Sequence, residues 1–189
     1  MKINNSTGLL ENVTFIASPN TDQRSDQCPI SLVVLHNISL PPGQFEGDWV
    51  QAFFTNSLPA EADPYFESIQ HLEVSSHLYI RRDGEIIQFV PFNQRAWHAG
   101  VSCYQQETGC NDFSIGIELE GTDNLPYENT QYEVLTEVLN ALFIAYPSLK
   151  KERITGHCHI APDRKTDPGE SFDWSKLRQM LNVKAFEKA

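Results

Sequence analysis

Apolar and polar residues along this chain form two kinds of pattern, one typical of strands and one typical of helices. Residues 31–36 form a short apolar run with two valines, which predicts a buried strand. Residues 114–120 alternate apolar and polar side chains, as a half-buried strand does. Residues 77–90 hold two apolar runs around an Asp-Gly turn and therefore predict a β-hairpin. A further strand is expected at 153–157.

The clearest helix signal covers residues 131–146. Apolar side chains recur there at helical spacing, and Thr130 with Glu133 predicts a capping box at the start. Shorter helices are expected to begin after three N-cap aspartates, Asp48, Asp63 and Asp173. Residues 1–30 are rich in polar side chains, so we expect them to be irregular.

Together these elements predict an α/β fold with a central mixed β-sheet flanked by helices. The length of 189 residues fits one domain that buries a single substantial core. The sequence contains no internal repeat, low-complexity tract or linker. We therefore expect a single domain over residues 1–189.

The composition narrows the choice of partner and compartment. A formal net charge of −11 argues against nucleic acid or an anionic membrane as a partner. A local basic pocket for an acidic small substrate stays open, with the candidates Arg81, Arg82, Arg95, Arg164 and Lys165. No apolar segment approaches the roughly 20 residues that cross a bilayer, and the first residues lack the apolar core of a signal peptide. We therefore expect a cytoplasmic protein whose four cysteines are reduced thiols.

The loop at 156–169 carries the strongest chemical signal. It places His157 and Asp167 ten residues apart, with Lys165 two residues before the aspartate. His36 ends the first predicted strand, and neighbouring strand ends present their side chains at one edge of a sheet. Two histidines and one aspartate form the three-ligand set of a catalytic zinc site, which leaves the fourth position to water. The alternative is that each histidine is a satisfied polar residue at a strand end.

The other histidines receive separate interpretations. His98 is expected to line the substrate cleft or to hydrogen-bond within its loop. His71 and His77 are expected to be structural. His159 is the main rival metal ligand, but we expect it to be exposed because the chain bends after His157.

Two glutamates and one cysteine complete the candidate chemistry. Glu118 and Glu120 lie on one face of their predicted strand, so either could reach a water at the metal, and the pattern does not choose between them. A solvated pair is the alternative. Cys158 stands between two histidines, which suggests a cysteine nucleophile. Adjacent strand residues point to opposite faces, however, and this disfavours the arrangement.

Five sequence blocks together resemble a known family. They are LHNISLPPG at 35–43, RRDGEI at 81–86, RAWHAGV at 95–101, NDFSIGIELEG at 111–121 and GHCHIAPDRKTDPG at 156–169. In this order and spacing the blocks resemble the N-acetylmuramoyl-L-alanine amidases of the AmpD type, over about residues 17–177. That family consists of cytoplasmic zinc hydrolases that recycle cell-wall fragments.

The resemblance implies roles for individual residues. His36, His157 and Asp167 would bind one zinc ion. Glu118 would be the catalytic carboxylate, and Lys165 would stabilise the oxyanion. The implied substrate is a small muropeptide, and the implied reaction hydrolyses the amide between 1,6-anhydro-N-acetylmuramic acid and L-alanine of the stem peptide. No protein partner is implied. The residues expected to contact the substrate are Trp97, His98 and Arg164.

Three rival functions remain at this point. The first is a recognition module that binds peptidoglycan fragments without cutting them, although such proteins lack metal ligands that are present here. The second is a cysteine hydrolase that uses Cys158 or Cys103. The third is a metal-dependent hydrolase of a different amide, which the ligand set alone does not exclude. A periplasmic amidase that acts on the intact wall is a variant of the main hypothesis.

Overall fold

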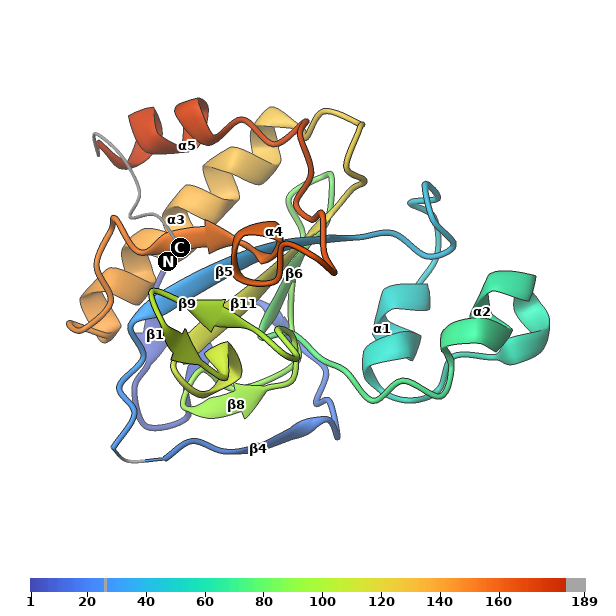
Figure 1. The fold of residues 1–189 in the computed structure, drawn as a ribbon, viewed down its shortest axis with the longest axis horizontal. Coiled ribbons are helices and arrows are strands. Elements are labelled where there is room, and N and C mark those ends of the chain that lie inside the picture. The colour runs from blue at the N-terminus through green and yellow to red at the C-terminus, as the bar shows by residue number, and fades with distance from the viewer. Residues whose placement is uncertain (26, 183–189) are drawn as a thin grey trace.

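The centre of the fold is a six-stranded mixed sheet (Figure 1). The computed structural model describes residues 1–25 and 27–182. Across the sheet the strands are β12 (Ile154–Gly156), β5 (Leu32–Ile38), β11 (Ser114–Glu120), β6 (Leu78–Ile80), β7 (Ile86–Gln88) and β3 (Thr14–Phe15). The first four run parallel, and β6 and β7 form the antiparallel hairpin that the sequence predicts.

Two helices cover one face of this sheet, α3 (Asn129–Ala145) and α5 (Trp174–Leu181). Alternate side chains of the central strands, such as Leu35 and Ile117, pack there in one apolar cluster with Leu135 of α3 and Leu177 of α5. Successive strand residues point to opposite faces, so the intervening side chains are left for the second face. The predicted class, a mixed sheet flanked by helices, is confirmed.

The second face of β5 and β11 is covered only in part. Leu32 and Val34 pack there with Tyr104 and Phe113. The cover is a segment with three short elements, β9 (Cys103–Tyr104), β10 (Glu107–Thr108) and the 3-10 helix η2 (Cys110–Asp112). All 7 residues of β11 are buried, so the prediction of a half-buried strand at 114–120 is wrong in that respect.

Two short helices with a 3-10 turn between them stand to one side of the sheet, namely α1 (Trp49–Phe54), η1 (Ala60–Ala62) and α2 (Pro64–Ile69) (Figure 1). They form a second apolar cluster, in which Phe53 packs with residues such as Phe89. Both helices begin after the predicted aspartates. Asp63 Oδ1 accepts a hydrogen bond from the N–H of Tyr65 at 2.8 Å, whereas Asp48 makes no capping bond with its side chain.

Residues 1–30 are more regular than the sequence predicts. Besides β3 they contain β1 (Ile3–Asn4), β2 (Leu9–Leu10) and β4 (Thr21–Gln23). β3 pairs with β7, and β4 pairs with β8 (Gln94–Ala96). Much of this order therefore comes from distant strands, and segments of two or three residues are too short to show a periodic pattern.

The predicted capping box of Thr130 and Glu133 is wrong, because α3 begins earlier. The side chain of Gln131 instead accepts a hydrogen bond from the N–H of Glu128 at 3.0 Å. Its amide group also donates to the buried carbonyl of Glu120 at 3.0 Å. A carboxylate at this position could not donate that bond.

The last predicted helix is confirmed as α5. Asp173 Oδ1 accepts a hydrogen bond from the N–H of Lys176 at 2.9 Å and so caps the helix. Among the described residues, no helix has the length and apolar character needed to cross a membrane. The expected domain of 1–189 includes residues 26 and 183–189, which lie outside the described residues, so its limits stay a prediction.

Candidate active site

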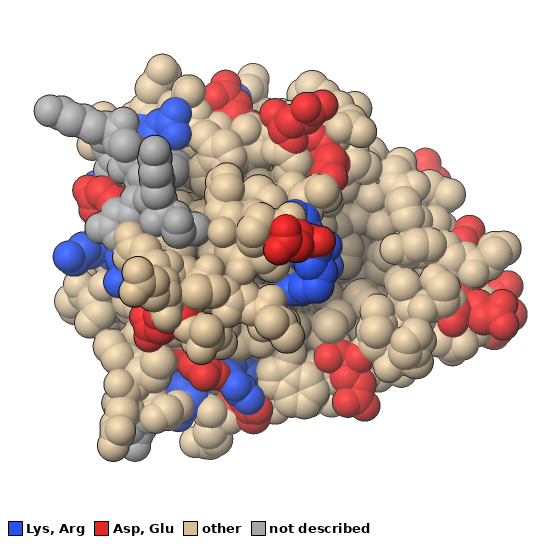
Figure 2. All heavy atoms as spheres, in the orientation of Figure 1, with Lys and Arg blue, Asp and Glu red and all other residues tan. Residues whose placement is uncertain are grey.

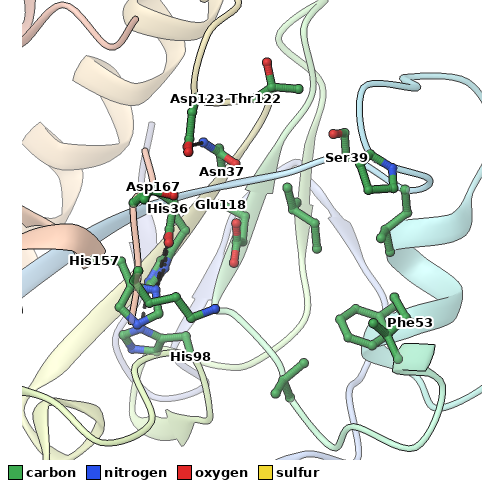
Figure 3. Close-up of a pocket in the computed structure, with 18 of the residues that line it drawn as sticks. His36, Asn37, Ser39, Phe53, His98, Glu118, Thr122, Asp123, His157 and Asp167 are labelled. Carbon is green, nitrogen blue, oxygen red and sulfur yellow. Dashed lines mark hydrogen bonds and ion pairs between the residues drawn. The ribbon is translucent and has the colours of Figure 1, made fainter. Parts of the chain in front are cut away.

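The candidate site lies at the carboxyl ends of the parallel strands, where ligands commonly bind to α/β sheets (Figure 3). In the register of β5 and β11, His36 lies beside Glu118. Both residues belong to the same partly covered face as Val34, because strand side chains alternate. β12 leads directly into the short helix α4 (His157–Ile160), whose first residue is His157.

The loop after α4 returns to the strand ends and brings Asp167 to the two histidines. The N–H of Cys158 donates to the carbonyl of Asp167 at 2.9 Å, which ties the loop to the helix. Gly156 allows this close return, since a Cβ at that position would lie 2.8 Å from Cδ of Pro168. The ten-residue separation seen in the sequence is therefore closed by a folded loop.

Three polar side chains meet here in a triangle (Figure 3). Nδ1 of His36 lies 3.0 Å from Nδ1 of His157. Oδ2 of Asp167 lies 2.9 Å from the first of these nitrogens and 3.1 Å from the second. The side chains of His36, His157 and Asp167 are 2%, 3% and 14% exposed. The structure thus brings together the three residues that the sequence proposes as metal ligands.

The charges of this triangle suit a cation. Burial lowers the pKa of His36 to about 4, despite the neighbouring carboxylate of Asp167, so its imidazole is neutral at pH 7. Burial also disfavours ionisation of Asp167, but the close contacts with the imidazoles of His157 and His36 outweigh it and hold the pKa of this carboxyl below its usual range. Neutral imidazole and ionised carboxylate are the ligand forms that metals bind.

The donor set also passes a chemical test for metal binding. Two ring nitrogens and one carboxylate oxygen lie within 4.8 Å of one another. Lone pairs that face one another this closely repel unless a cation lies between them. The residues present therefore fit a divalent metal ion with two nitrogen ligands and one oxygen ligand.

Glu118 is the unpaired carboxyl of the site. It is 9% exposed, and its Oε2 has no hydrogen-bond partner among the described residues. Burial raises the pKa of Glu118 well above its usual value; the charge of Asp167 adds to this rise and that of Lys165 opposes it. A buried carboxyl with a raised pKa and a free oxygen is suited to accept and return a proton.

Glu120 has a different environment, although it shares a strand face with Glu118. Its carboxylate accepts hydrogen bonds from the hydroxyl of Tyr79 at 2.6 Å and from the N–H of Arg82 at 2.9 Å. These bonds join β11 to the β6–β7 hairpin. The structure therefore separates a carboxyl that is free to react from one that is used to hold strands together.

A cleft of about 650 Å³ opens next to the triangle and Glu118. His36, His157 and Glu118 line one side of it, and Phe53 with other apolar residues of the α1–α2 region lines the opposite side (Figure 3). Figure 2 shows Lys and Arg side chains gathered beside a hollow in the middle of the molecule. Lys165 and Arg164 are among the basic residues that line the cleft.

The three residues expected to contact substrate all line the cleft, but their polar atoms differ in availability. The guanidinium of Arg164 donates to the carbonyls of Ala99 at 2.8 Å and Val101 at 2.9 Å. Both ring nitrogens of His98 have protein partners, His36 on one side and Ser114 on the other. Trp97 is partly exposed at the wall.

The remaining candidates lie outside the triangle. His77 is fully buried, and its Nδ1 accepts a hydrogen bond from the N–H of Gly116 at 3.0 Å, which is a structural role. His159 is exposed, as expected, and accepts from the N–H of Gly156 at 3.2 Å. All four cysteines are free. Burial raises the pKa of Cys158, so little of it is the thiolate that a cysteine nucleophile requires.

Two features of the site were missed by sequence reasoning. One is the apolar wall, which includes Tyr65 and Leu72. Spacing on short helices gives no means of telling such residues from ordinary core. The other is Asn111, whose Oδ1 accepts from the N–H groups of His98 at 3.1 Å and Ala99 at 2.8 Å. In the sequence, only its place in the block 111–121 set Asn111 apart, and that place does not show that its side chain binds the backbone of residues 98–99.

Comparison with known proteins identifies the family. The model of the family described as N-acetylmuramoyl-L-alanine amidase matches residues 26–170. The chain belongs to this amidase family. The 1,6-anhydro-N-acetylmuramyl-L-alanine amidase AmpD of Citrobacter freundii is 56% identical over 174 residues, which cover 92% of each chain.

Solved structures agree with this assignment. A crystal structure of a selenomethionine derivative of AmpD matches with a TM-score of 0.92 and 55% identity, over 96% of this chain and 99% of that one. The N-acetylmuramyl-L-alanine amidase AmiD from E. coli, in complex with the substrate anhydro-N-acetylmuramic acid-L-Ala-D-gamma-Glu-L-Lys, matches with a TM-score of 0.60 and 27% identity. That match covers 88% of this chain and 63% of the AmiD chain. The amidase fold expected from the sequence is therefore confirmed.

Proposed function

We propose that this protein is a zinc-dependent amidase that cleaves 1,6-anhydro-N-acetylmuramoyl-L-alanine bonds in muropeptides. The hydrolysed bond joins the lactyl carbonyl of the sugar to the nitrogen of L-alanine in the stem peptide. The observation that carries the proposal is the triangle of His36, His157 and Asp167, with the unpaired carboxyl of Glu118 on the same cleft. AmpD proteins at this level of identity bear the name of the same activity.

The triangle residues would hold one zinc ion. Nδ1 of His36, Nδ1 of His157 and Oδ2 of Asp167 would be the donor atoms, as in catalytic sites with three protein ligands. When bound, zinc supplies Lewis acidity to the substrate carbonyl and makes water more acidic. The cleft beside the triangle leaves room for both substrate and water.

Glu118 acts as the proton carrier. Its ionised carboxylate takes a proton from the attacking water as the new carbon–oxygen bond forms. It then gives that proton to the nitrogen of L-alanine as the carbon–nitrogen bond breaks, so one water is consumed and no proton is gained or lost. Burial favours the return step, because the raised pKa of Glu118 makes its protonated form easier to reach than that of an exposed glutamate.

Lys165 balances the negative charge that develops on the carbonyl oxygen. It lines the cleft, and its charge acts on Glu118. A well-placed donor of this kind stabilises the transition state by about 3 kcal/mol in comparable sites. Removal of the Lys165 charge should therefore lower kcat more than it weakens substrate binding.

Substrate contacts come from the walls of the cleft. Trp97 offers an aromatic surface beside the reacting groups. Arg164 is held against two backbone carbonyls, so it contributes positive charge near the mouth rather than a free guanidinium fork. The apolar wall around Phe53 and Leu72 is suited to the less polar parts of the ligand.

A recognition module without catalysis is the second candidate, and the intact donor set disfavours it. A cytoplasmic location stays a prediction that fractionation of cells would test.

The test is cleavage of a purified anhydro-muropeptide, followed by mass spectrometry of the products. Zinc-loaded protein should release anhydro-N-acetylmuramic acid and a free peptide that begins with L-alanine. Activity should disappear after metal stripping and return with zinc. The Glu118→Gln variant, prepared in parallel, controls for a contaminating amidase. Intact substrate in the presence of one bound zinc per chain would overturn the proposal.

A further inference from the structure

The outer nitrogens of the two histidine ligands are both hydrogen-bonded. Each ring points Nδ1 at the triangle and Nε2 away from it. Nε2 of His36 lies 3.0 Å from Nδ1 of His98, and Nε2 of His157 lies 3.1 Å from the carbonyl oxygen of Ala99. One short stretch, residues 98–99, thus provides the hydrogen-bond partner of Nε2 in both rings.

The partners of His98 fix the direction of its hydrogen bonds. The hydroxyl of Ser114 donates to the carbonyl oxygen of Cys110, which can only accept. The hydroxyl oxygen of Ser114 is then left to accept from Nε2 of His98, at 3.2 Å. A neutral imidazole has one donor and one acceptor, so Nδ1 of His98 must accept.

The chain of bonds continues to the metal-binding atom. Since Nδ1 of His98 accepts, Nε2 of His36 must carry the proton that is donated to it. Nδ1 of His36 then keeps its lone pair, which points toward His157 and Asp167. The carbonyl of Cys110 therefore determines, through three successive hydrogen bonds, that His36 is protonated at Nε2 and unprotonated at Nδ1.

The second ligand is oriented by a simpler device. The carbonyl of Ala99 can only accept, so Nε2 of His157 carries the proton and Nδ1 is free to bind. The same carbonyl also accepts from Arg164 at 2.8 Å, and Arg164 belongs to the loop that carries Asp167.

The sequence provides space and support for this arrangement. A Cβ at position 116 would lie 2.4 Å from Cγ of His98, so only glycine lets the ring rest directly on β11. Asn111 fixes the backbone of the same stretch through its bonds to the N–H groups of His98 and Ala99. The imidazole of His98 therefore packs directly on Gly116, and Asn111 fixes the backbone to which the ring is attached.

We propose that His98 is a positioning residue that sets the tautomer of His36, through Ser114 and the carbonyl of Cys110, and thereby raises the zinc affinity of the site. This inference rests on the proposed metal-binding role of His36. Partners of this kind orient a ligand ring and increase its basicity, and their loss typically lowers metal affinity about 10–100-fold.

The test measures zinc affinity directly, by competition with a chromophoric chelator. His98→Leu keeps most of the side-chain volume but removes the acceptor, and we expect its zinc affinity to fall about 10–100-fold. His98→Gln offers an amide oxygen as acceptor and should recover part of that loss. His71→Leu removes an exposed imidazole outside the cleft and is the matched control, with wild-type affinity expected.

A second readout follows the tautomer itself. In the zinc-loaded wild type, long-range proton–nitrogen NMR spectra should show a protonated Nε2 for His36 that exchanges slowly with solvent. His98→Leu should make this proton exchange faster. Ser114→Ala, which breaks the chain one bond further away, should lower zinc affinity by a smaller factor and keeps the test open if His98→Leu fails to fold.

The outcomes separate this inference from the proposed function. A folded His98→Leu protein with wild-type zinc affinity and a slowly exchanging His36 proton would overturn the role of His98 alone. A wild-type protein that binds no zinc would overturn both proposals. Loss of affinity in His98→Leu, with partial recovery in His98→Gln, supports the inference even if the muropeptide is not the substrate.

Discussion

The two walls of the cleft are built in different ways. The wall that carries the triangle, here called the chemical wall, is formed by the ends of parallel strands. Backbone or side-chain partners hold the rings of His36 and His157 through their Nε2 atoms. The opposite wall, here called the helical wall, is made by the α1–α2 region, which stands to one side of the sheet (Figure 1). Its cleft residues include Tyr65, 40% exposed, and Leu72, 41% exposed.

This difference indicates that the chemical wall carries the reacting groups and the helical wall carries apolar binding surface. Reacting groups need fixed positions, and rigid strands with hydrogen-bonded neighbours provide them. Apolar surface needs shape and area more than direction, and short helices can provide both. We therefore expect substitutions on the first wall to change metal binding or kcat, and substitutions on the second to change KM.

The largest expected effect on the first wall is loss of a ligand. Asp167→Asn removes the only negative charge among the three donors, so zinc binding and turnover should fall below detection. Zinc content by elemental mass spectrometry and kcat/KM for the muropeptide measure the two effects. Asp123→Asn changes another carboxylate of the same cleft and should keep its zinc. Equal zinc loss in both variants would show that the assignment of the ligand is wrong.

Removal of the proton carrier should be almost as severe while leaving the metal in place. Glu118→Gln should lower kcat about 10²–10⁴-fold, the usual contribution of general acid–base catalysis, with zinc content unchanged. Glu120→Gln is the matched control on the same strand face. It should affect stability more than kcat, because Tyr79 and Arg82 use that carboxylate. The assignment fails if Glu120→Gln is the variant that loses turnover.

Neutralising the oxyanion partner should have a smaller effect on the same wall. Lys165→Met should lower kcat about 10²-fold, because about 3 kcal/mol of transition-state stabilisation is at stake and part of it is replaced by water. KM should change little. Steady-state kinetics at saturating substrate measures this, and full turnover in the variant would contradict the role of Lys165.

On the helical wall we expect an effect on binding instead. Leu72→Ala removes apolar area from the cleft, so KM should rise up to about tenfold while kcat stays within about twofold. Leu125→Ala alters a leucine of similar exposure that does not line the cleft, and it should leave both constants unchanged. A large fall in kcat for Leu72→Ala would show that the two walls are not functionally separate.

The last prediction concerns stability and not activity. Because burial raises the pKa of Glu118, the folded protein binds this proton more tightly than the unfolded chain does. In metal-free protein the free energy of unfolding should therefore fall as pH rises above about 4.5, the usual pKa of a glutamate side chain. Glu118→Gln should be more stable than the wild type by about 1–3 kcal/mol at pH 8, and the difference should shrink toward pH 4. Thermal melts of metal-free samples at both pH values measure it.

The sequence predicted the chemical wall better than the helical wall, for physical reasons. His36 follows an apolar run, and Asp167 shares a Pro/Gly-rich loop with His157, so local pattern alone brought these residues into one hypothesis. The pattern of the strand itself could not show whether Glu118 or Glu120 is the catalytic carboxyl. It depends on Tyr79 and Arg82, which lie on a different part of the sheet.

Other features depend on contacts between distant segments. The position of His98 requires a glycine at 116 and the hydroxyl of Ser114 on a neighbouring strand, and neither is visible from the spacing of histidines. The first thirty residues gain much of their order from β7 and β8, far along the chain. Leu72 and similar apolar residues of the helical wall have the same pattern as core residues, so only the fold reveals that they line a cleft.

Zinc titration of metal-free protein, with release of the L-alanyl peptide followed at saturating anhydro-muropeptide, tests the central claim most directly. The account predicts that turnover rises in proportion to added zinc and stops rising at one equivalent per chain, whereas Asp167→Asn stays inactive throughout. Turnover by the metal-free protein, or no turnover after one equivalent of zinc has bound, would contradict it.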